Sequence, residues 1–151
     1  MVLFADEVKN IFSARDIEDL HMAVMNAELD TSGEIRVHLD DTCEGDPMQR
    51  AKEIFSKLEM EQTALRNGVL FYIAVSPRKF AILSDFGINA VVPLDFWDEI
   101  QQNLRNNIRE NNFIDGLFDA IIQTGIQLKK HFPRLVTDVN ELPDDISFGR
   151  I

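Results

Sequence analysis

The chain has 151 residues, a net charge of −11 and an apolar fraction of 45%, the size and composition of one soluble globular domain. Its acidity disfavours nucleic acid and anionic lipid as partners, and a single cysteine, Cys43, excludes an internal disulfide or a multi-cysteine zinc site. We see no signal peptide and no apolar run near the ~20 residues that span a bilayer, so we expect a cytoplasmic protein without membrane insertion.

The first forty residues predict two helices and a strand. Residues 2–12 have the pattern of a short amphipathic helix, and Ser13 with Asp16 three positions later is the signature of a helix N-cap. Residues 34–40 alternate strictly between apolar and polar side chains, which is typical of a strand. This strand either has one buried face, or its polar face is covered by a charged partner.

A crossover helix and a second strand are predicted next. We interpret the loop at 41–47 as a solvated acidic loop, with its charges on Asp40, Asp41, Glu44 and Asp46. Pro47 then opens a helix from about 48 to 65, capped by Asp46. We expect Asn67-Gly68 to end this helix and lead into a strand. A right-handed crossover makes the strands at 34–40 and 69–75 parallel.

Residues 69–83 predict the central hairpin of the sheet. The run 69–75 is continuously apolar, as in a strand buried on both faces, and a polar turn with Pro77 separates it from a second run at 80–83. Two amphipathic helices, at about 96–108 and 113–132, follow this hairpin.

Together these elements predict a single α/β domain over residues 1–151, with a core at about 12–132 and an irregular C-terminal tail at 133–151. The expected architecture is a Rossmann-like three-layer α/β/α sandwich, in which helices cover both faces of a small mixed sheet of three or four strands. The sequence contains no phosphate-binding glycine motif, nucleophile elbow or HExxH. We interpret the histidines as structural or surface residues: His21, His38 and His131.

One end of the predicted sheet collects polar side chains. If the strands pair as predicted, one rim gathers the residues that we call the hairpin rim: Glu34, Asn67, Asp85, Asn89 and, from its helix, Asp115. Carboxylate and amide oxygens are hard ligands that suit Ca²⁺, with Mg²⁺ or another divalent ion as alternatives. The competing interpretation is that Asp85 and Asn89 only cap a turn and that Asn67 only caps a helix.

Two stretches of the sequence stand out as motifs: Asn67-Gly-Val-Leu-Phe-Tyr-Ile-Ala-Val and Arg78-Lys-Phe-Ala-Ile-Leu-Ser-Asp-Phe-Gly-Ile-Asn89. With Ser32-Gly33, Pro93 and Asp115-Gly116-Leu117, they resemble the TPM domain family, named for thylakoid lumen acid-phosphatase-like, photosystem II repair and acetylcholine-receptor modulator proteins. The resemblance covers roughly residues 12–132. Further residues resemble a bacterial stand-alone branch that lacks a membrane anchor: Met60, Thr63, Arg66, Asp138 and Asn140–Pro143.

The resemblance implies an α/β/α sandwich, binding of a divalent metal, chiefly calcium, near the hairpin rim, and the phosphatase activity proposed for plant relatives. The sequence departs from the family pattern at three positions. Arg66 stands where many members have Asp, Asp85 stands in place of a common Gly, and Asn89 stands where Glu is common. These exchanges keep the rim polar but change its charge.

Three functions follow as hypotheses. The first is a calcium-binding module with Asp85 as the principal ligand, Arg66 either pairing with it in the metal-free state or holding an anion. The second is a metal-independent interaction domain that binds a protein partner through the tail or the helix of Trp97. The third is a metal-assisted acid phosphatase in which Arg66 binds phosphate. The sequence identifies no catalytic residues.

Overall fold

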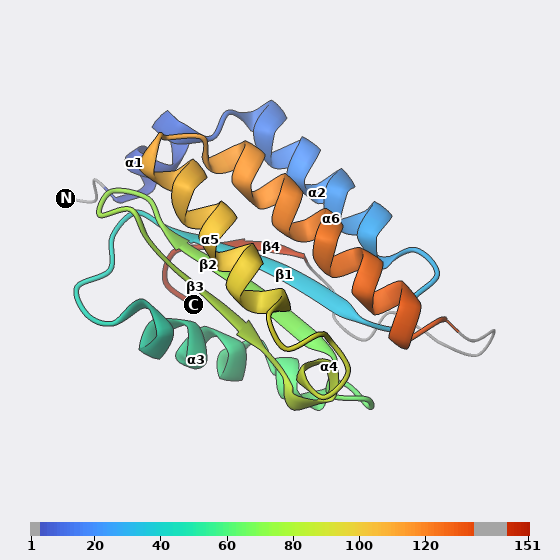
Figure 1. Cartoon of the computed structure of the whole chain (residues 1–151). Helices are drawn as coiled ribbons and strands as arrows, with labels where there is room; N and C mark the ends of the chain where they lie inside the picture. The colour runs from blue at the N-terminus through green and yellow to red at the C-terminus, as the bar shows by residue number, and fades with distance from the viewer. Residues whose placement is uncertain (1–3, 135–144) are drawn as a thin grey trace.

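A mixed sheet of four strands forms the middle layer of the structure (Figure 1). The computed structural model describes residues 4–134 and 145–151. In the order β3-β2-β1-β4, strand β1 is parallel to both of its neighbours and β2 is antiparallel to β3. The strands span Glu34–Asp40 (β1), Gly68–Ala74 (β2), Lys79–Ser84 (β3) and Ile146–Phe148 (β4). The predicted parallel crossover and antiparallel hairpin are therefore confirmed.

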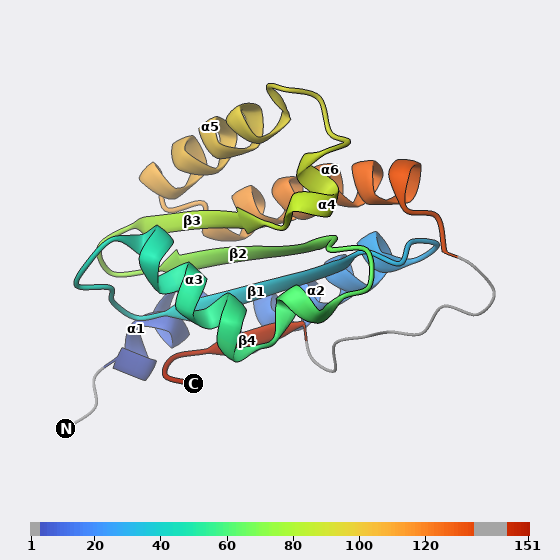
Figure 2. The same cartoon turned by 90° about the horizontal axis from the view of Figure 1, so that it is seen from below.

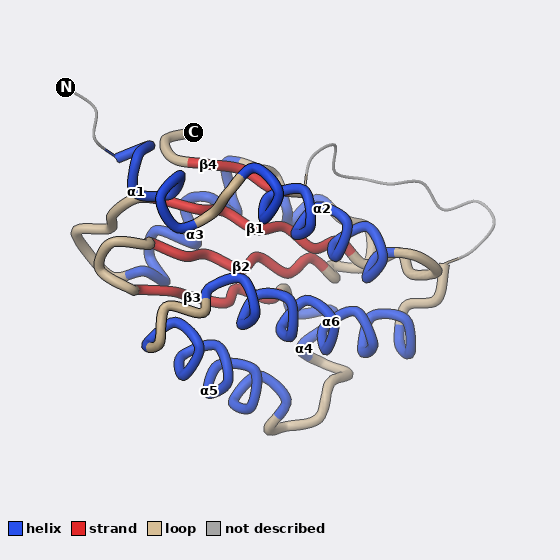
Figure 3. Tube along the Cα trace, turned by 90° about the horizontal axis from the view of Figure 1, so that it is seen from above, coloured by secondary structure: helices blue, strands red, loops and turns tan. Residues whose placement is uncertain are grey.

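Helices cover both faces of the sheet, as the views from below and above show (Figures 2 and 3). Helices α2, α5 and α6, with α1, share the core on one face, and α3 packs on the other. The helices span Phe4–Ile11 (α1), Ala14–Glu28 (α2), Pro47–Lys57 (α3), Phe86–Asn89 (α4), Phe96–Arg109 (α5) and Phe113–His131 (α6). The predicted three-layer α/β/α sandwich is confirmed.

Strand β2 contributes to both cores. Its odd-numbered residues, Val69 to Ile73, join the larger core with the helices α1, α2, α5 and α6. Its even-numbered residues, Leu70 to Ala74, join the smaller core beneath α3. All seven residues are buried, which explains why this stretch of sequence is continuously apolar instead of alternating.

The helix starts predicted from local sequence are confirmed. Ser13 and Asp16 form a reciprocal capping box, in which each side chain accepts a hydrogen bond from the other residue's backbone N–H. Asp46 accepts a hydrogen bond from the backbone N–H of Met48 at 3.2 Å, and Pro47 is the first residue of α3.

The helix predicted over 48–65 is wrong in its C-terminal part. Helix α3 ends at Lys57, and Glu59 takes a left-handed backbone conformation with a φ of 56°, which no α-helix continues through. A 3₁₀ turn at Met60–Gln62 follows, and Arg66, with a φ of 50°, turns the chain into β2. Asn67-Gly68 therefore leads into the strand, as predicted, but does not cap a helix.

The C-terminal tail is not wholly irregular, because residues 146–148 form β4. They pair in parallel with β1 opposite Val37, His38 and Leu39. Three residues are too few to give a periodic signal in the sequence. The remainder of the predicted tail between 135 and 144, including Asp138 and Asn140–Pro143, lies outside the described residues.

Helix α4 packs tightly against the loop that precedes β2. The backbone N–H of Gly87 donates a hydrogen bond to the carbonyl of Arg66 at 2.8 Å. A Cβ at position 87 would lie 2.0 Å from the carbonyl oxygen of Leu65 and 2.5 Å from that of Arg66. Only glycine therefore allows the two backbone segments to approach this closely.

We expect Gly87→Ala to destabilise the protein by roughly 3 kcal/mol, because the added methyl group meets backbone atoms that cannot move aside. Chemical denaturation measures the change in the free energy of unfolding. Gly45→Ala is the matched control, since a Cβ there has no atom within 4 Å. Equal stabilities for the two variants would contradict the packing described for α4.

Candidate functional site

Asn67 is the buried centre of the hairpin rim. It is 1% exposed and lies directly before β2, beside the start of β1. Its Nδ2 donates to the hydroxyl of Ser32 at 3.3 Å. Among the described residues, neither its Oδ1 nor the hydroxyl of Thr63 has a hydrogen-bond partner, and both are buried. The side chain thus ties the loop before β2 to the loop before β1, and leaves one oxygen for water or a ligand.

Asp85 is paired with Arg66 across the end of the hairpin. One carboxylate oxygen accepts from Nε of Arg66 at 2.6 Å, and the other accepts from the backbone N–H of Phe86, which starts α4. The guanidinium lies 4.3 Å from the centre of the Phe86 ring. The hydrogen bond to Asp85 raises the pKa of Arg66. A cation at Asp85 would have to displace this guanidinium.

Glu34 lies beside a second carboxyl group, that of the half-buried Glu28 at the end of α2. Glu28 accepts a hydrogen bond from the backbone N–H of Ile35 at 2.7 Å. Burial, together with the neighbouring Glu34, raises the pKa of Glu28 to about 8. Glu34 therefore interacts with a carboxyl on the side of β1 that faces away from Asp85.

The remaining two rim residues do not complete a metal shell. The Oδ1 of Asn89 accepts hydrogen bonds from the hydroxyl of Ser84 at 2.6 Å and from Nε1 of Trp97 at 2.8 Å. Asp115 lies in the first turn of α6, close to Asn111, which Arg78 of the β2–β3 turn contacts at 2.9 Å. Asp115 is therefore near the closed end of the hairpin, about 20 Å from its open end.

The structure thus brings the five predicted ligands together only in part. Glu34, Asn67, Asp85 and Asn89 lie at the same end of the sheet, and Asp115 is at the other end. The side-chain oxygens of Asp85 and Asn89 accept hydrogen bonds from protein groups, whereas the Oδ1 of Asn67 has no partner among the described residues. In residues 4–134 and 145–151, no three His, Cys, Asp or Glu side chains converge in a way that could hold a metal ion. Asp85 caps α4 and Asn89 bonds back to Ser84, as the competing interpretation of the sequence expected, but Asn67 does not cap a helix.

A second polar region lies on the face of β1 that is covered by α3. Asp40 is buried, and its Oδ2 accepts hydrogen bonds from the hydroxyl of Tyr72 at 2.6 Å and from Nε of Arg50 at 3.0 Å. Burial alone would raise the pKa of Asp40, but hydrogen bonds from His38, Tyr72 and Arg50 outweigh it and hold that pKa below its usual value. Burial and the hydrogen bond to Asp40 together raise the pKa of Tyr72.

His38 connects this region to the C-terminal strand. The ring is fully buried, its Nδ1 lies 2.7 Å from the hydroxyl of Ser147, and its Nε2 lies 2.7 Å from the carbonyl oxygen of Gly149 and 3.2 Å from Asp40. Arg50 donates to the same carbonyl at 3.1 Å. The interpretation of His38 as a structural residue agrees with this geometry.

Above these buried groups a cleft of about 610 Å³ opens between the loop 41–46, α3 and the residues that follow β4. It lies at the carboxyl ends of β1 and β4, where open α/β sheets commonly bind ligands. Two guanidinium groups line it, those of Arg50 and Arg150. Five carboxylates line it as well: Asp40, Asp41, Glu44, Asp46 and Glu53. We call this region the acidic cleft.

The carboxylates of the acidic cleft divide into occupied and exposed groups. Asp41 accepts a hydrogen bond from the backbone N–H of Val8 at 2.7 Å and is buried, like Asp40. Glu44, Asp46 and Glu53 are exposed, and Glu53 is 3.6 Å from Arg50. The sequence interpretation of this loop as merely solvated missed the cleft, because the residues after β4, which form one wall, gave no signal. The strict alternation of polar and apolar residues along 34–40 was the indication in the sequence that this side of the sheet is polar.

The loop 41–46 already binds a positive group. The ammonium of Lys79, at the start of β3, donates to the carbonyl oxygens of Cys43 and Gly45 at 3.0 Å each. Two converging carbonyls beside exposed carboxylates are the oxygen environment that hard cations prefer.

Comparison with known proteins identifies the family. The sequence profile of the TPM domain matches residues 6–126. The chain belongs to the TPM domain family. The NMR structure of the BA42 protein from the psychrophilic bacterium Bizionia argentinensis is 42% identical, with a TM-score of 0.84 over 95% of this chain and 99% of that one. Among curated proteins no match was found.

A more distant structure confirms the fold alone. The N-terminal domain of the cg2496 protein from Corynebacterium glutamicum is 11% identical to this TPM domain, with a TM-score of 0.60 over 89% of this chain and 79% of that one. Within the described part of the TPM domain, no helix has the length and apolar character needed to cross a membrane.

The Glu28–Glu34 pair predicts a stability that depends on pH. The pKa of Glu28 is higher in the folded protein than its ordinary value of 4.5. The stability that Glu28 contributes is therefore complete below about pH 4.5 and is lost as the pH rises through 8. Glu28→Gln keeps the uncharged form at every pH. We expect the variant to gain about 2–4 kcal/mol over the wild type between pH 5 and pH 9, measured by denaturation. Glu18→Gln, at an exposed position, is the control. Parallel pH profiles of the free energy of unfolding for the wild type and both variants would refute this expectation.

The Asp40 network predicts a second effect on stability. Asp40→Asn leaves Arg50 without its buried partner, so we expect a loss of roughly 2–4 kcal/mol at pH 7. Because the folded-state pKa of Asp40 is lowered, this difference should shrink as the pH falls below 3.8 and through that pKa. Glu53→Gln removes only the exposed partner of Arg50 and should cost less than about 0.5 kcal/mol. A similar cost for both variants would argue against the network.

Proposed function

We propose that this TPM domain binds a divalent cation, calcium first among the candidates, and that the ion enters the acidic cleft. The observation that carries the proposal is the loop 41–46, where the ammonium of Lys79 is held by two backbone carbonyls beside exposed carboxylates. A cleft with an excess of one charge sign concentrates ions of the opposite sign. The overall charge of −11 acts in the same direction.

The residues that would hold the ion are the exposed carboxylates Glu44, Asp46 and Glu53. Asp40 and Asp41 are committed to internal hydrogen bonds and would act through their charge. Since no three acidic side chains converge in the described residues, water would supply much of the ion's coordination shell, as the six to eight oxygens of calcium permit. Such a shell suits weak, reversible binding.

The hairpin rim is the alternative location, and two observations bear on it. Asn67 offers a buried oxygen without a described partner, but the principal carboxylate, Asp85, is neutralised by Arg66. Binding there would require breaking a 2.6 Å ion pair. In the cleft the ion can bind the exposed carboxylates while Lys79 keeps the carbonyl oxygens of Cys43 and Gly45.

A calcium titration followed by ¹H–¹⁵N NMR separates these locations. We expect the amide signals of Gly45, Asp46 and Gly149 to move with added calcium, and those of Asn67 and of residues 86–89 to stay unchanged. Shifts confined to the second set would place the ion at the rim and overturn the cleft. If neither set moved at millimolar calcium, the protein would not be a calcium-binding domain.

Calorimetry with neutralised variants tests the ligands. The double variant Glu44→Gln with Glu53→Gln should weaken calcium binding by about tenfold or more, because affinity follows the number of charged ligands. The double variant Glu99→Gln with Glu110→Gln changes the net charge equally at two exposed residues, one in the first turn of α5 and one directly after its end, and should bind as the wild type does. Equal weakening in both would show a general charge effect and no site.

A further inference from the structure

Helices α2 and α6 lie side by side on the outer surface of the molecule and run in the same direction (Figure 1). They pack tightly at Ala27 and Gly125, where a Cβ on the glycine would lie 2.7 Å from the Cβ of Ala27. The small residues leave a groove of about 350 Å³ between the helices, over Ala23 and Ala27. This groove faces away from the sheet and from the acidic cleft.

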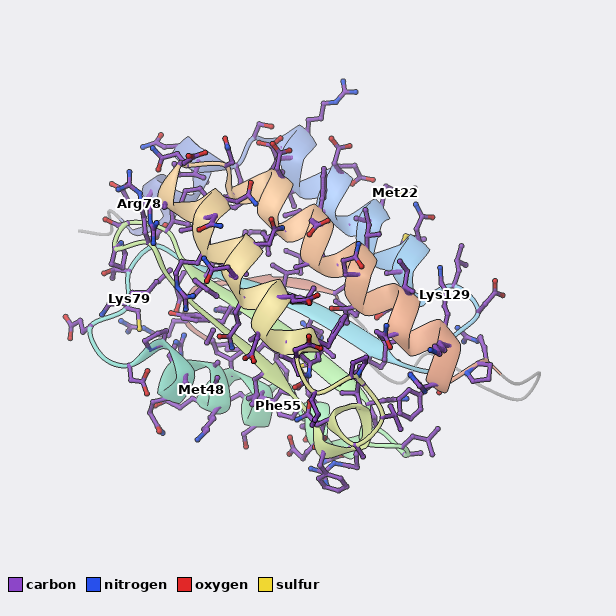
Figure 4. All side chains as sticks on the ribbon, viewed as in Figure 1. Met22, Met48, Phe55, Arg78, Lys79 and Lys129 are labelled. Atoms are coloured by element: carbon purple, nitrogen blue, oxygen red, sulfur yellow. The ribbon has the colours of Figure 1, made fainter. Side chains whose placement is uncertain are left out.

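The borders of the groove are apolar and exposed. Met22 on α2 is 45% exposed, and Ile122 and Ile126 on α6 are 54% and 52% exposed. Figure 4 shows Met22 projecting from the outer side of α2. Scattered exposed apolar residues need no explanation, but several around one groove mark an interaction surface.

The two ends of the groove carry opposite charges. Positions along the helices follow from the rise per residue, counted from the contact of Ala27 with Gly125. Asp19 lies about 12 Å from this contact toward the N-terminal ends of the helices, and Lys129 lies about 6 Å from it toward their C-terminal ends. The midpoint between the charges falls between Ile122 and Ile126. Asp19 has only a loose 4.0 Å contact with Arg15, whose side chain is 90% exposed.

Such a surface is complementary to itself. A two-fold axis through the midpoint brings the apolar centre of one copy onto that of another and places each negative end against a positive end. Because α2 and α6 are parallel, the same axis also opposes their helix dipoles. We propose that two copies of this chain associate through the groove, with Asp19 of each copy paired with Lys129 of the other.

Sedimentation equilibrium tests the association. The wild type should show a monomer–dimer equilibrium up to near-millimolar concentration, and Ile122→Glu should raise the dissociation constant by at least about tenfold, because it puts charges at the apolar centre. Leu94→Glu is the matched control, since Leu94 is fully exposed in a loop, and it should dimerise as the wild type does. A wild-type protein that stays monomeric throughout overturns the proposal.

Charge reversal identifies the pairing. Asp19→Lys and Lys129→Asp should each weaken self-association, since each places like charges opposite one another. An equimolar mixture of the two variants should form heterodimers, in which every pair is again of opposite sign, with circular dichroism confirming that both are folded. Combining both reversals in one chain should also restore the dimer. Failure of the mixture to associate more tightly than either variant alone would rule out this two-fold arrangement.

Discussion

The burial of a charged strand face is the constraint on which the rest of this structure depends. All seven residues of β1 are buried, although every second one is polar or charged. Buried charges are tolerated only when they are paired and hydrogen-bonded. Around Asp40 the partners come from three elements: Arg50 of α3, Tyr72 of β2 and His38 of β1 itself. The position of α3 over the sheet is thereby fixed by polar contacts as well as by the smaller core.

The same requirement accounts for the return of the chain to the sheet at its C-terminus. His38 is fully buried and finds partners for its ring nitrogens on β4 and the residue after it, at Ser147 and Gly149. A strand of three residues gains little from its own ladder of hydrogen bonds. Its attachment to β1 is reinforced by His38 and Arg50, and this attachment closes one side of the acidic cleft. Stability of the core and the shape of the candidate binding region thus have a common origin.

Much of the fold was predictable, because it follows from local and periodic signals. The capping pair Ser13 and Asp16, the alternation along β1 and the apolar run of β2 each indicated the element that forms. The end of α3 was not predictable from periodicity, because it depends on the left-handed backbone at Glu59 in a stretch that still has a helical pattern. β4 was missed because its pairing is non-local and its three residues are too few for a pattern.

The candidate site was less predictable than the fold. The predicted topology placed Asn67 and Asp85 at one end of the sheet, where the structure has them. It did not specify the directions in which their side chains point. Which oxygen of Asp85 meets Arg66, and that Glu34 interacts with Glu28, depends on tertiary contacts that no sequence spacing specifies. Asp115 was misplaced because α6 begins at the hairpin turn and not at its open end. The alternation of polar and apolar residues along β1, by contrast, indicated the polar side chains that lie beneath the acidic cleft.

The shortness of β4 has a consequence for the edge of the sheet. Within the described residues, β4 pairs with β1 only from Val37 onward. The backbone N–H of Ile35, on the same edge of β1, therefore has no partner strand in the described part of the chain. The carboxyl group of Glu28 accepts the hydrogen bond from that N–H, and a side chain at the end of α2 thus occupies the place of a neighbouring strand. A helix terminus thus satisfies a strand backbone group that would otherwise lack a partner strand, one of the ways in which a sheet edge is covered without lengthening the sheet.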